Sequence, residues 1–506
     1  MRHTEKAARI PEHKNTRNNF NYMEENKVIE NRELSIWEAL IPVFALIGML
    51  AYNVLFVYKD DALSGSNQFI LLLGAAVAAV VGFFNKVSYE VMMEEVARNV
   101  KSTTGAILIL LMVGALSGTW LISGIIPSMI YYGLQILNPT IFLAACVIIC
   151  AIISVATGSS WTTSATVGIA LIGIGDALGI SLGMTAGAVL SGAYFGDKMS
   201  PLSDTTNLAP AMAGTDLFTH IRYMALTTVP TITVTLIVFI ILGFTIDTTG
   251  KPDTDGILAA IDESFYISPW LFIVPALVIL MIIRKTQPLI ALLTGTLLGG
   301  VFAVIFQPDI VTGIAGESSL NFHSAYRGVM DAITIDTSVE TTNPALNDLF
   351  SAGGMSGMLG TIWLIICAMV FGGVMEAIGA LARITDSLLK LFHTTFGLFA
   401  STVASCLALN ATASDQYLAI VVPGKMFAKA YKDKGLAPEN LSRSLEDSGT
   451  VTSVLIPWNT CGAYHSSVLG VSPTAYAGYA VFNYLSPFMT LLFAAFRIKI
   501  KQLSDK

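Results

Sequence analysis

Long apolar runs are the feature that most limits how this chain folds. Several of them reach the roughly 20 residues that a helix needs to cross the hydrocarbon core of a bilayer. The composition agrees, because 54% of the 506 residues are hydrophobic and 12% are charged, against about 25% charged in soluble domains. We therefore predict an all-α polytopic membrane protein that has the lipid bilayer as its surroundings.

The chain carries an internal duplication. The segment Ala156-Thr157-Gly158-Ser159-Ser160 returns as Ala411-Thr412-Ala413-Ser414-Asp415, an offset of 411 − 156 = 255 residues. The same offset aligns further residues: Gly105 with Gly360, Gly118 with Gly373, Gly124 with Gly379, and Thr205 with Thr460. A register shared along so much of the chain indicates two related halves.

About ten membrane spans are predicted, five in each half. The first five lie near 34–57, 66–85, 104–137, from 182 onward and at 225–246, and the second five lie near 268–284, 287–306, 357–381, from 441 onward and at 472–496. Four glycines in the third run predict that it packs closely against other helices: Gly105, Gly114, Gly118 and Gly124.

Two further segments are predicted to be re-entrant hairpins, with their tips at Ala156–Ser160 and Ala411–Asp415. Each tip ends an apolar run with small polar residues, and irregular backbone at membrane depth persists only where it is buried in protein or lines water. Discontinuous helices are predicted around 196–207 and 446–462. Prolines there remove backbone donors, and hydroxyls and carboxylates compete for backbone groups.

The distribution of Lys and Arg predicts which side each loop faces. Residues 1–33 are polar, hold seven Lys and Arg and are predicted to form a disordered cytoplasmic tail. The basic segments are placed inside and the acidic ones outside. This gives a first repeat at 34–246, an external linker at 247–267, an inverted second repeat at 268–497 with an external loop at 307–356, and a cytoplasmic tail at 498–506. Both termini are then cytoplasmic.

Acidic residues inside apolar surroundings are candidates for ion binding or proton transfer, because a carboxylate at membrane depth is costly without water, a cation or a partner. The candidates are Asp204, Asp415, Asp197, Glu446 and Asp447. Asp204 and Asp415 lead as Na⁺ sites, since the repeat aligns them with the neutral residues Asn459 and Ser160. For Asp197 a local ion pair with Lys198 stays open as an alternative, and Glu446 and Asp447 could instead lie at the cytoplasmic mouth.

Neutral polar residues at the tips and breaks supply oxygen ligands, which suit a hard monovalent cation such as Na⁺ better than a soft metal. These candidates are Thr157, Ser159, Ser160, Thr205, Asn207, Asn410, Thr412, Ser414, Asn459 and Thr460. The five cysteines show no CxxC spacing, so neither a disulfide framework nor a resident metal or other cofactor is expected. The sequence gives no support for nucleic-acid binding.

The stretch Gly192–Asn207, together with Pro457-Trp458-Asn459-Thr460, resembles the NhaC family of bacterial sodium/proton antiporters. The likeness covers about residues 35–500. It implies a transporter rather than an enzyme, of the ion-transporter superfamily with inverted repeats and paired hairpins. Its expected activity is exchange of Na⁺ for H⁺ across the bacterial cytoplasmic membrane by alternating access.

Two other functions stay open at this point. Some relatives are similar to malate/lactate antiporters, and helix N-termini with Ser/Thr-rich tips can also hold a carboxylate, so an organic-acid exchanger coupled to Na⁺ and H⁺ is the second hypothesis. An intramembrane aspartyl protease is a distant third, suggested by Gly175-Asp176 and Gly196-Asp197. The expected partners are Na⁺, H⁺ and the bilayer, with a homodimer left open.

Overall fold

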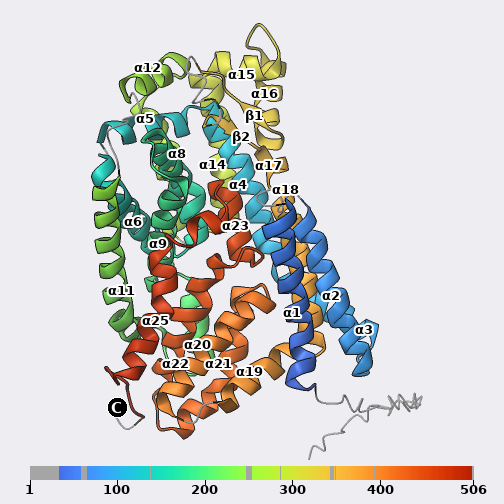
Figure 1. Ribbon diagram of the computed structural model, residues 1–506. Helices are drawn as coiled ribbons and strands as arrows, with labels where there is room; N and C mark the ends of the chain where they lie inside the picture. Colours follow the sequence, from blue (N-terminus) through green and yellow to red (C-terminus); the bar gives the residue numbers. More distant parts are fainter. Residues whose placement is uncertain are drawn as a thin grey trace, which may run out of the picture.

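In the computed structural model, the described residues are 34–58, 65–136, 138–246, 254–284, 286–341, 347, 349–391 and 394–503. They form an elongated bundle of helices with one small antiparallel sheet (Figure 1). The predicted tail at 1–33 and parts of both acidic segments lie outside these residues.

The helices of the first half are mostly long and apolar. They are α1 (Ile36–Tyr52), η1 (Asn53–Tyr58), α2 (Ser66–Phe84), α3 (Tyr89–Ser102), α4 (Thr104–Ile122), α5 (Ile125–Ile136), α6 (Pro139–Thr157), α7 (Ser160–Thr163), η3 (Ser164–Gly168), α8 (Ile169–Ala177), α9 (Leu182–Met199), α10 (Asp204–Ala213) and α11 (Leu217–Thr245).

The second half contains more short elements. They are α12 (Thr254–Ser264), η4 (Pro269–Phe272), α13 (Ile273–Ile283), α14 (Pro288–Phe306), α15 (Pro308–Ala315), α16 (Phe322–Thr334), β1 (Thr337–Ser338), β2 (Ser351–Ala352), α17 (Gly354–Gly357), α18 (Leu359–Ala377), α19 (Ala380–Leu391), α20 (Thr395–Thr412), α21 (Gln416–Asp433), α22 (Pro438–Leu445), η6 (Glu446–Thr450), η7 (Ser453–Leu455), α23 (Thr460–Leu469), α24 (Pro473–Tyr476) and α25 (Val481–Ala495).

Eight helices in the described part of the chain are long and apolar enough to cross a membrane, or nine if the bent pair Asp255–Ser264 and Pro269–Ile283 is one span. Large apolar side chains on their outer surfaces are exposed, among them Trp37, Phe244 and Ile305. Such a surface is stable in hydrocarbon and unfavourable in water. The chain is therefore a helical, multi-pass membrane protein, as predicted.

Some predicted spans are divided. The run at 104–137 is not one span, because Gly124 adopts a left-handed backbone (φ 79°) that ends α4 and lets α5 start in a new direction. An added Cβ on Gly114 or Gly118 would meet backbone atoms of Gly354 or Ala332, so these glycines do allow close packing, whereas Gly105 has open space around it.

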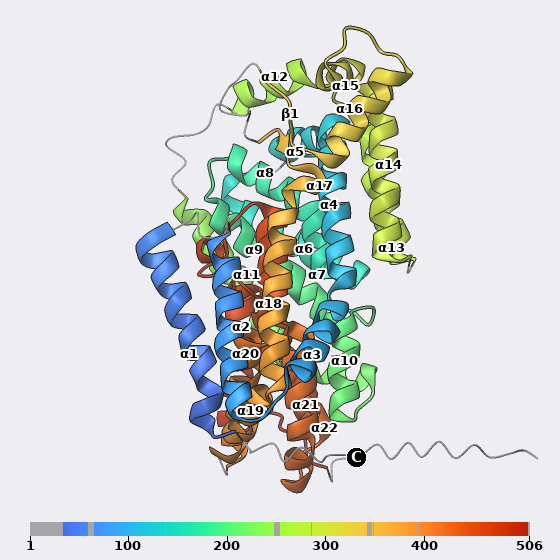
Figure 2. The same ribbon diagram turned by 90° about the vertical axis from the view of Figure 1, so that its right-hand side faces the viewer.

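Three other segments differ from the prediction. The last predicted span, 472–496, contains the short α24 and then α25, and the long acidic loop folds into α15, α16, the β1–β2 pair and α17. An amphipathic helix, α3, was not predicted. It lies at the end of the bundle opposite α5 and leads into α4 (Figure 2).

The chain turns back at both predicted hairpin tips. The helices that lead to the tips, α6 and α20, are two of the eight long apolar helices and run from opposite ends of the bundle (Figure 1). Helix α6 stops where Gly158 turns left-handed (φ 73°), and the chain returns through α7, η3 and α8 to lie beside α5. Helix α20 stops at Ala413, Ser414 takes the left-handed turn (φ 59°), and α21 returns to the end that holds α19.

Helix boundaries recur at the same offset of 255 residues. Adding 255 to the bounds of α4, 104–122, gives 359–377, the bounds of α18. Adding 255 to the bounds of α5, 125–136, gives 380–391, the bounds of α19. Related sequences in the two halves therefore form helices of the same length at corresponding places.

Close packing of α9 on α6 fixes the first tip beside the first helix break. A Cβ added to Gly192 or Gly196 would collide with the backbone of α6, so both positions need glycine for this approach. The Ser154 hydroxyl donates to the Ala193 carbonyl (2.5 Å), and the Ser200 hydroxyl donates to the Val155 carbonyl (2.8 Å). These bonds tie the end of α6 to the end of α9.

Candidate functional site

The two hairpin tips and the first helix break meet at one cavity of about 600 Å³. Three carboxylates line it: Asp197 on α9, Asp204 on α10 and Asp415 at the second tip. Uncharged polar residues complete much of the wall: Ser102, Thr103, Thr157, Ser159, Thr162, Ser203, Thr205, Thr286, Gln287, Gln416, Tyr417 and Thr460. Segments that are far apart in the sequence thus contribute to one polar space.

Asp197 lies in the last turn of α9 and is almost fully buried. Its carboxylate accepts hydrogen bonds from the hydroxyl of Ser160 (2.6 Å) and from the backbone N–H of Ser160 (3.2 Å). A charge-assisted hydrogen bond of this kind stabilises the ionised form of the acid. The first hairpin tip therefore holds the Asp197 carboxylate at the cavity wall.

Asp415 is the N-cap of α21 and accepts a hydrogen bond from the backbone N–H of Leu418 (3.0 Å). It is 5% exposed and lines the cavity. Free N–H groups and the helix dipole at a helix N-terminus favour a negative charge. The side chain thus both caps the second hairpin's return helix and offers a carboxylate oxygen to the cavity.

Asp204 is the first residue of α10 and is exposed to the cavity. The preceding Ser203 caps the helix by accepting from the Thr206 N–H (3.4 Å). The hydroxyl of Thr206 donates to the carbonyls of Asp197 and Lys198 (both 3.0 Å), which joins the start of α10 to the end of α9. Asp204 and Asp197 therefore keep a fixed relationship across the break.

The cavity has the electrostatic character of a cation site. Three carboxylates face it, and none of the described lining residues is Lys, Arg or His. Within the described chain, no three His, Cys, Asp or Glu side chains are grouped closely enough to hold a metal ion together. Carboxylates with hydroxyl and carbonyl oxygens beside them are the oxygen ligands that a hard cation prefers.

Four of the predicted neutral ligands line the cavity, namely Thr157, Ser159, Thr205 and Thr460. Ser160 does not line the cavity, but its hydroxyl donates to Asp197, which does. Five others do not line it: Asn207, Asn410, Thr412, Ser414 and Asn459.

Hydrogen bonding within the protein explains most of these absences. Asn459 donates to the carbonyl (3.0 Å) and the side-chain oxygen (3.2 Å) of Asn410, which itself donates to the Gly449 carbonyl (2.8 Å). Asn207 donates to the carbonyls of Pro201 and Ser203, and Thr412 to the carbonyl of Ala408. These side chains brace the breaks and the second tip instead of facing the cavity.

Glu446 and Asp447 also lie outside the cavity wall, both fully buried in η6. Neither is at a solvent-exposed mouth. Asp447 forms an ion pair with Lys198, which is fully buried too, and accepts hydrogen bonds from the hydroxyls of Thr227 (2.9 Å) and Thr490. The local pairing of Lys198 with Asp197 that the sequence left open is therefore not formed.

The sequence did not single out Thr227, Thr490 or the wall residues contributed by the end of α3 and the α13–α14 connection, such as Ser102 and Gln287. One signal was present for the ion pair, since a lysine at membrane depth needs an acidic partner. It could not identify Asp447 as that partner, because the two residues lie 249 positions apart.

Comparisons with known proteins identify the family. Residues 192–498 match the Na⁺/H⁺ antiporter family. The Na⁺/H⁺ antiporter NhaC of Alkalihalophilus pseudofirmus is 37% identical, over 84% of this chain and 88% of its own length. NhaC of Bacillus subtilis is 35% identical, over 78% of this chain and 84% of its own. The malate-2H⁺/Na⁺-lactate antiporter of Bacillus subtilis is 37% identical, over 86% and 88%. The resemblance indicated by the motifs is thus confirmed, and the chain belongs to the Na⁺/H⁺ antiporter family.

Proposed function

We propose that this chain exchanges Na⁺ for H⁺ across the bacterial cytoplasmic membrane by alternating access to the central cavity. The observation that carries the proposal is the meeting of both hairpin tips and the first helix break at a cavity with three carboxylates and no basic side chain among its described lining residues. The antiporters named above are relatives over most of the chain.

In this mechanism Na⁺ and H⁺ occupy the cavity carboxylates alternately. Asp204 and Asp415 bind Na⁺ with oxygens of Thr157, Thr205 or Thr460, and Asp197 adds a third carboxylate that Ser160 holds in place. A protonated carboxyl group loses the charge that attracts the cation, so each ion displaces the other. Movement of the hairpins relative to the rest of the bundle would then expose the site to the other side.

We also infer an inverted-topology repeat with both termini in the cytoplasm. The equal helix lengths at an offset of 255 and the approach of α6 and α20 to their tips from opposite ends of the bundle support it (Figure 1). The segments at 86–101 and 425–443, which carry three and five Lys or Arg residues, then lie on the same, cytoplasmic side. Since Ser102 and Thr103 line the cavity next to the first of these segments, we assign this conformation to the inward-facing state.

The direct test uses purified protein in liposomes, with ²²Na⁺ uptake and internal pH recorded together. Asp204→Asn and Asp415→Asn keep side-chain size but remove the charge, so each should abolish or uncouple exchange. Asp262→Asn, an exposed carboxylate on α12, is the matched control and should behave as the parent. Parental exchange in both cavity variants would place the ion site elsewhere.

Exchange of an organic acid is the second candidate, favoured by one observation. A cavity of about 600 Å³ lies within the roughly 300–1,000 Å³ of small-molecule sites, and a relative is a malate/lactate antiporter. Against it, Lys198 is engaged by Asp447 and does not line the cavity. Uptake of radiolabelled malate or lactate driven by a Na⁺ gradient, at rates comparable to Na⁺/H⁺ exchange, would favour this alternative.

A further inference from the structure

Outside the cavity, the structure buries a strongly polar stretch of chain. Every residue from Glu439 to Thr450 is buried, although this segment of α22 and η6 holds one arginine and three acids. An apolar core gains nothing from such residues, because each charge must be removed from water. The segment runs from the end of the bundle that holds the C-terminal residues toward the second helix break (Figure 1).

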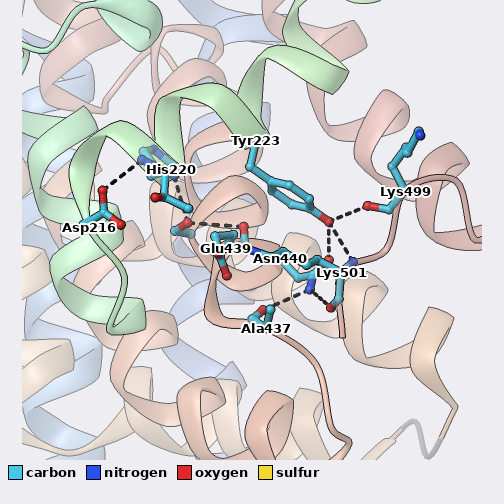
Figure 3. Close-up of polar contacts among 10 residues, drawn as sticks. Asp216, His220, Tyr223, Ala437, Glu439, Asn440, Lys499 and Lys501 are labelled. Carbon is cyan, nitrogen blue, oxygen red and sulfur yellow. Dashed lines mark hydrogen bonds and ion pairs between the residues drawn. The ribbon is translucent and has the colours of Figure 1, made fainter. Parts of the chain in front are cut away.

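The end of this segment that holds Glu439 and Asn440 contacts Lys501, near the C-terminus (Figure 3). Lys501, which is 35% exposed, donates to Glu439 (2.6 Å). The Tyr223 hydroxyl contacts the side-chain oxygen of Asn440 (2.5 Å) and the carbonyl of Lys499 (2.7 Å). These contacts form a polar network at the N-terminal end of α22.

Glu446 lies in the part of this segment that is nearer the second helix break, and it has an unusual environment. It is fully buried, and neither of its carboxylate oxygens has a hydrogen-bond partner. It begins the π-helical segment η6, a distortion that often marks functional positions. An ionised carboxylate in that setting costs free energy unless a cation or a bound proton neutralises it. It can therefore store one proton.

The charged and titratable groups around Glu446 come from several helices. They are Asp447 beside it, Asp197 and Lys198 on α9, and Cys406 on α20. Arg443 lies three residues earlier on α22, and helices α10 and α21, which also pack on η6, carry Asp204 and Tyr431 among their residues. Helix α25 packs on η6 and contributes Thr490 but no charged side chain. Arg443 stacks on the rings of Tyr223 and Phe493, and its guanidinium nitrogens have no acceptor.

Lys198 connects this group with the cavity. It pairs with Asp447 next to Glu446, and along α9 it follows Asp197, which lines the cavity. A cation arriving at Asp197 makes the local potential more positive, which disfavours a proton on Glu446. Loss of the proton in turn makes the site more favourable for the cation. The two ions can thus oppose each other without sharing a carboxylate.

We propose that Glu446 carries an exchanged proton on a path separate from the Na⁺ cavity, with Lys198 and Asp447 as positioning residues that couple it to Asp197. The proton reaches Glu446 along the buried polar segment of α22 and leaves when Na⁺ binds. This inference rests on the proposed Na⁺/H⁺ exchange and adds to it a proton site outside the cavity.

Glu446→Gln tests the proposal, because the amide imitates the neutral acid and cannot release a proton. The ratio of H⁺ to Na⁺ moved should fall at least twofold, whereas ²²Na⁺/Na⁺ exchange, which needs no net proton transfer, should keep its parental rate. Ser448→Ala, a neighbour in η6, is the matched control and should change neither. Glu446→Asp keeps an acid and should retain proton coupling.

A parental H⁺/Na⁺ ratio in the Glu446→Gln variant would overturn the proposal, as would loss of Na⁺/Na⁺ exchange in folded Glu446→Gln protein. Failure of the cavity proposal gives a different result, namely parental exchange in both Asp204→Asn and Asp415→Asn.

A second measurement needs no variant. Dicyclohexylcarbodiimide adds to protonated carboxylic acids in apolar surroundings, giving an N-acylurea that mass spectrometry can locate. Labelling of Glu446 in the parent protein should decrease at least twofold as Na⁺ is raised at constant pH, with K⁺ as the control cation. Labelling that does not respond to Na⁺ would contradict coupling between the two sites.

Discussion

The ion pair of Lys198 and Asp447 makes a quantitative prediction about stability. Both side chains are 0% exposed, so neither charge is solvated once its partner is removed. Removing one member of such a pair typically costs about 3–5 kcal/mol, because the other charge stays buried. In Lys198→Met, Asp447 would keep two hydroxyl donors, Thr227 and Thr490. Because these donors partly stabilise its charge, we expect this substitution to lower the free energy of unfolding by about 3 kcal/mol, the lower end of the range.

Asp447→Leu should cost more, near 5 kcal/mol, because Lys198 would be left facing the ring of Phe482 at 5.5 Å. The double variant contains neither charge and should be more stable than either single variant. Asp386→Asn provides the control, since its partners Lys390 and Arg383 are 70% and 33% exposed and surface pairs contribute about 0–1 kcal/mol.

Reversible unfolding in mixed detergent micelles, followed by circular dichroism, measures these differences. The reasoning predicts a coupling free energy of about 3 kcal/mol or more between the two positions. Additive losses in the double variant would refute it, because they would mean that neither charge depends on the other for its burial.

Three further predictions concern ion competition, topology and packing. Lowering the pH should raise the apparent KM for Na⁺, because protons compete with Na⁺ for the cavity carboxylates. A KM that stays constant across the pH titration would mean that Na⁺ and H⁺ share no carboxylate. Membrane-impermeant thiol reagents applied to intact cells should label Ser319→Cys and not Lys434→Cys; the reverse pattern would invert the topology. Gly192→Ala should cost about 1–3 kcal/mol, since the new Cβ meets the Val147 carbonyl, and Gly313→Ala on the open face of α15 should be nearly neutral; equal folding yields for both would contradict that packing.

Much of the architecture followed from the sequence because membranes limit the available structures. Apolar length located most spans, and small polar residues after apolar runs located both hairpin tips, since only protein-buried or water-lining backbone can be irregular there. The division at Gly124 was less predictable. A glycine between apolar runs can serve packing or a left-handed turn, and here the backbone conformation decides for the turn.

The candidate site was predicted in part for a similar reason. Burial cost identified Asp197, Asp204 and Asp415, which do line one cavity. The same criterion could not separate them from Glu446 and Asp447, because cost alone does not say what a buried acid faces. The separation depends on tertiary contacts such as that between Asp447 and Lys198, which sequence spacing does not reveal.

The helix caps of the two halves do not align at the offset of 255 residues. By sequence, Asp415 aligns with Ser160, but the residue that caps the return helix of the first hairpin is Ser159, and Asp415 caps that of the second. At the breaks, Ser203 caps α10 and Asn459 caps α23, again one residue later than the offset of 255 predicts.

A physical reason for the shift is present at the tips. Gly158 takes the left-handed turn in the first tip, whereas the aligned residue is Ala413 and the turn falls on Ser414, one residue later. The carboxylate of Asp415 is thereby placed on the free N–H groups of α21, where a neutral serine stands in the first half. Because asparagine caps helices about as well as aspartate, Asp415→Asn should remove the charge and preserve the tip. Any loss of exchange in that variant can therefore be attributed to the charge itself.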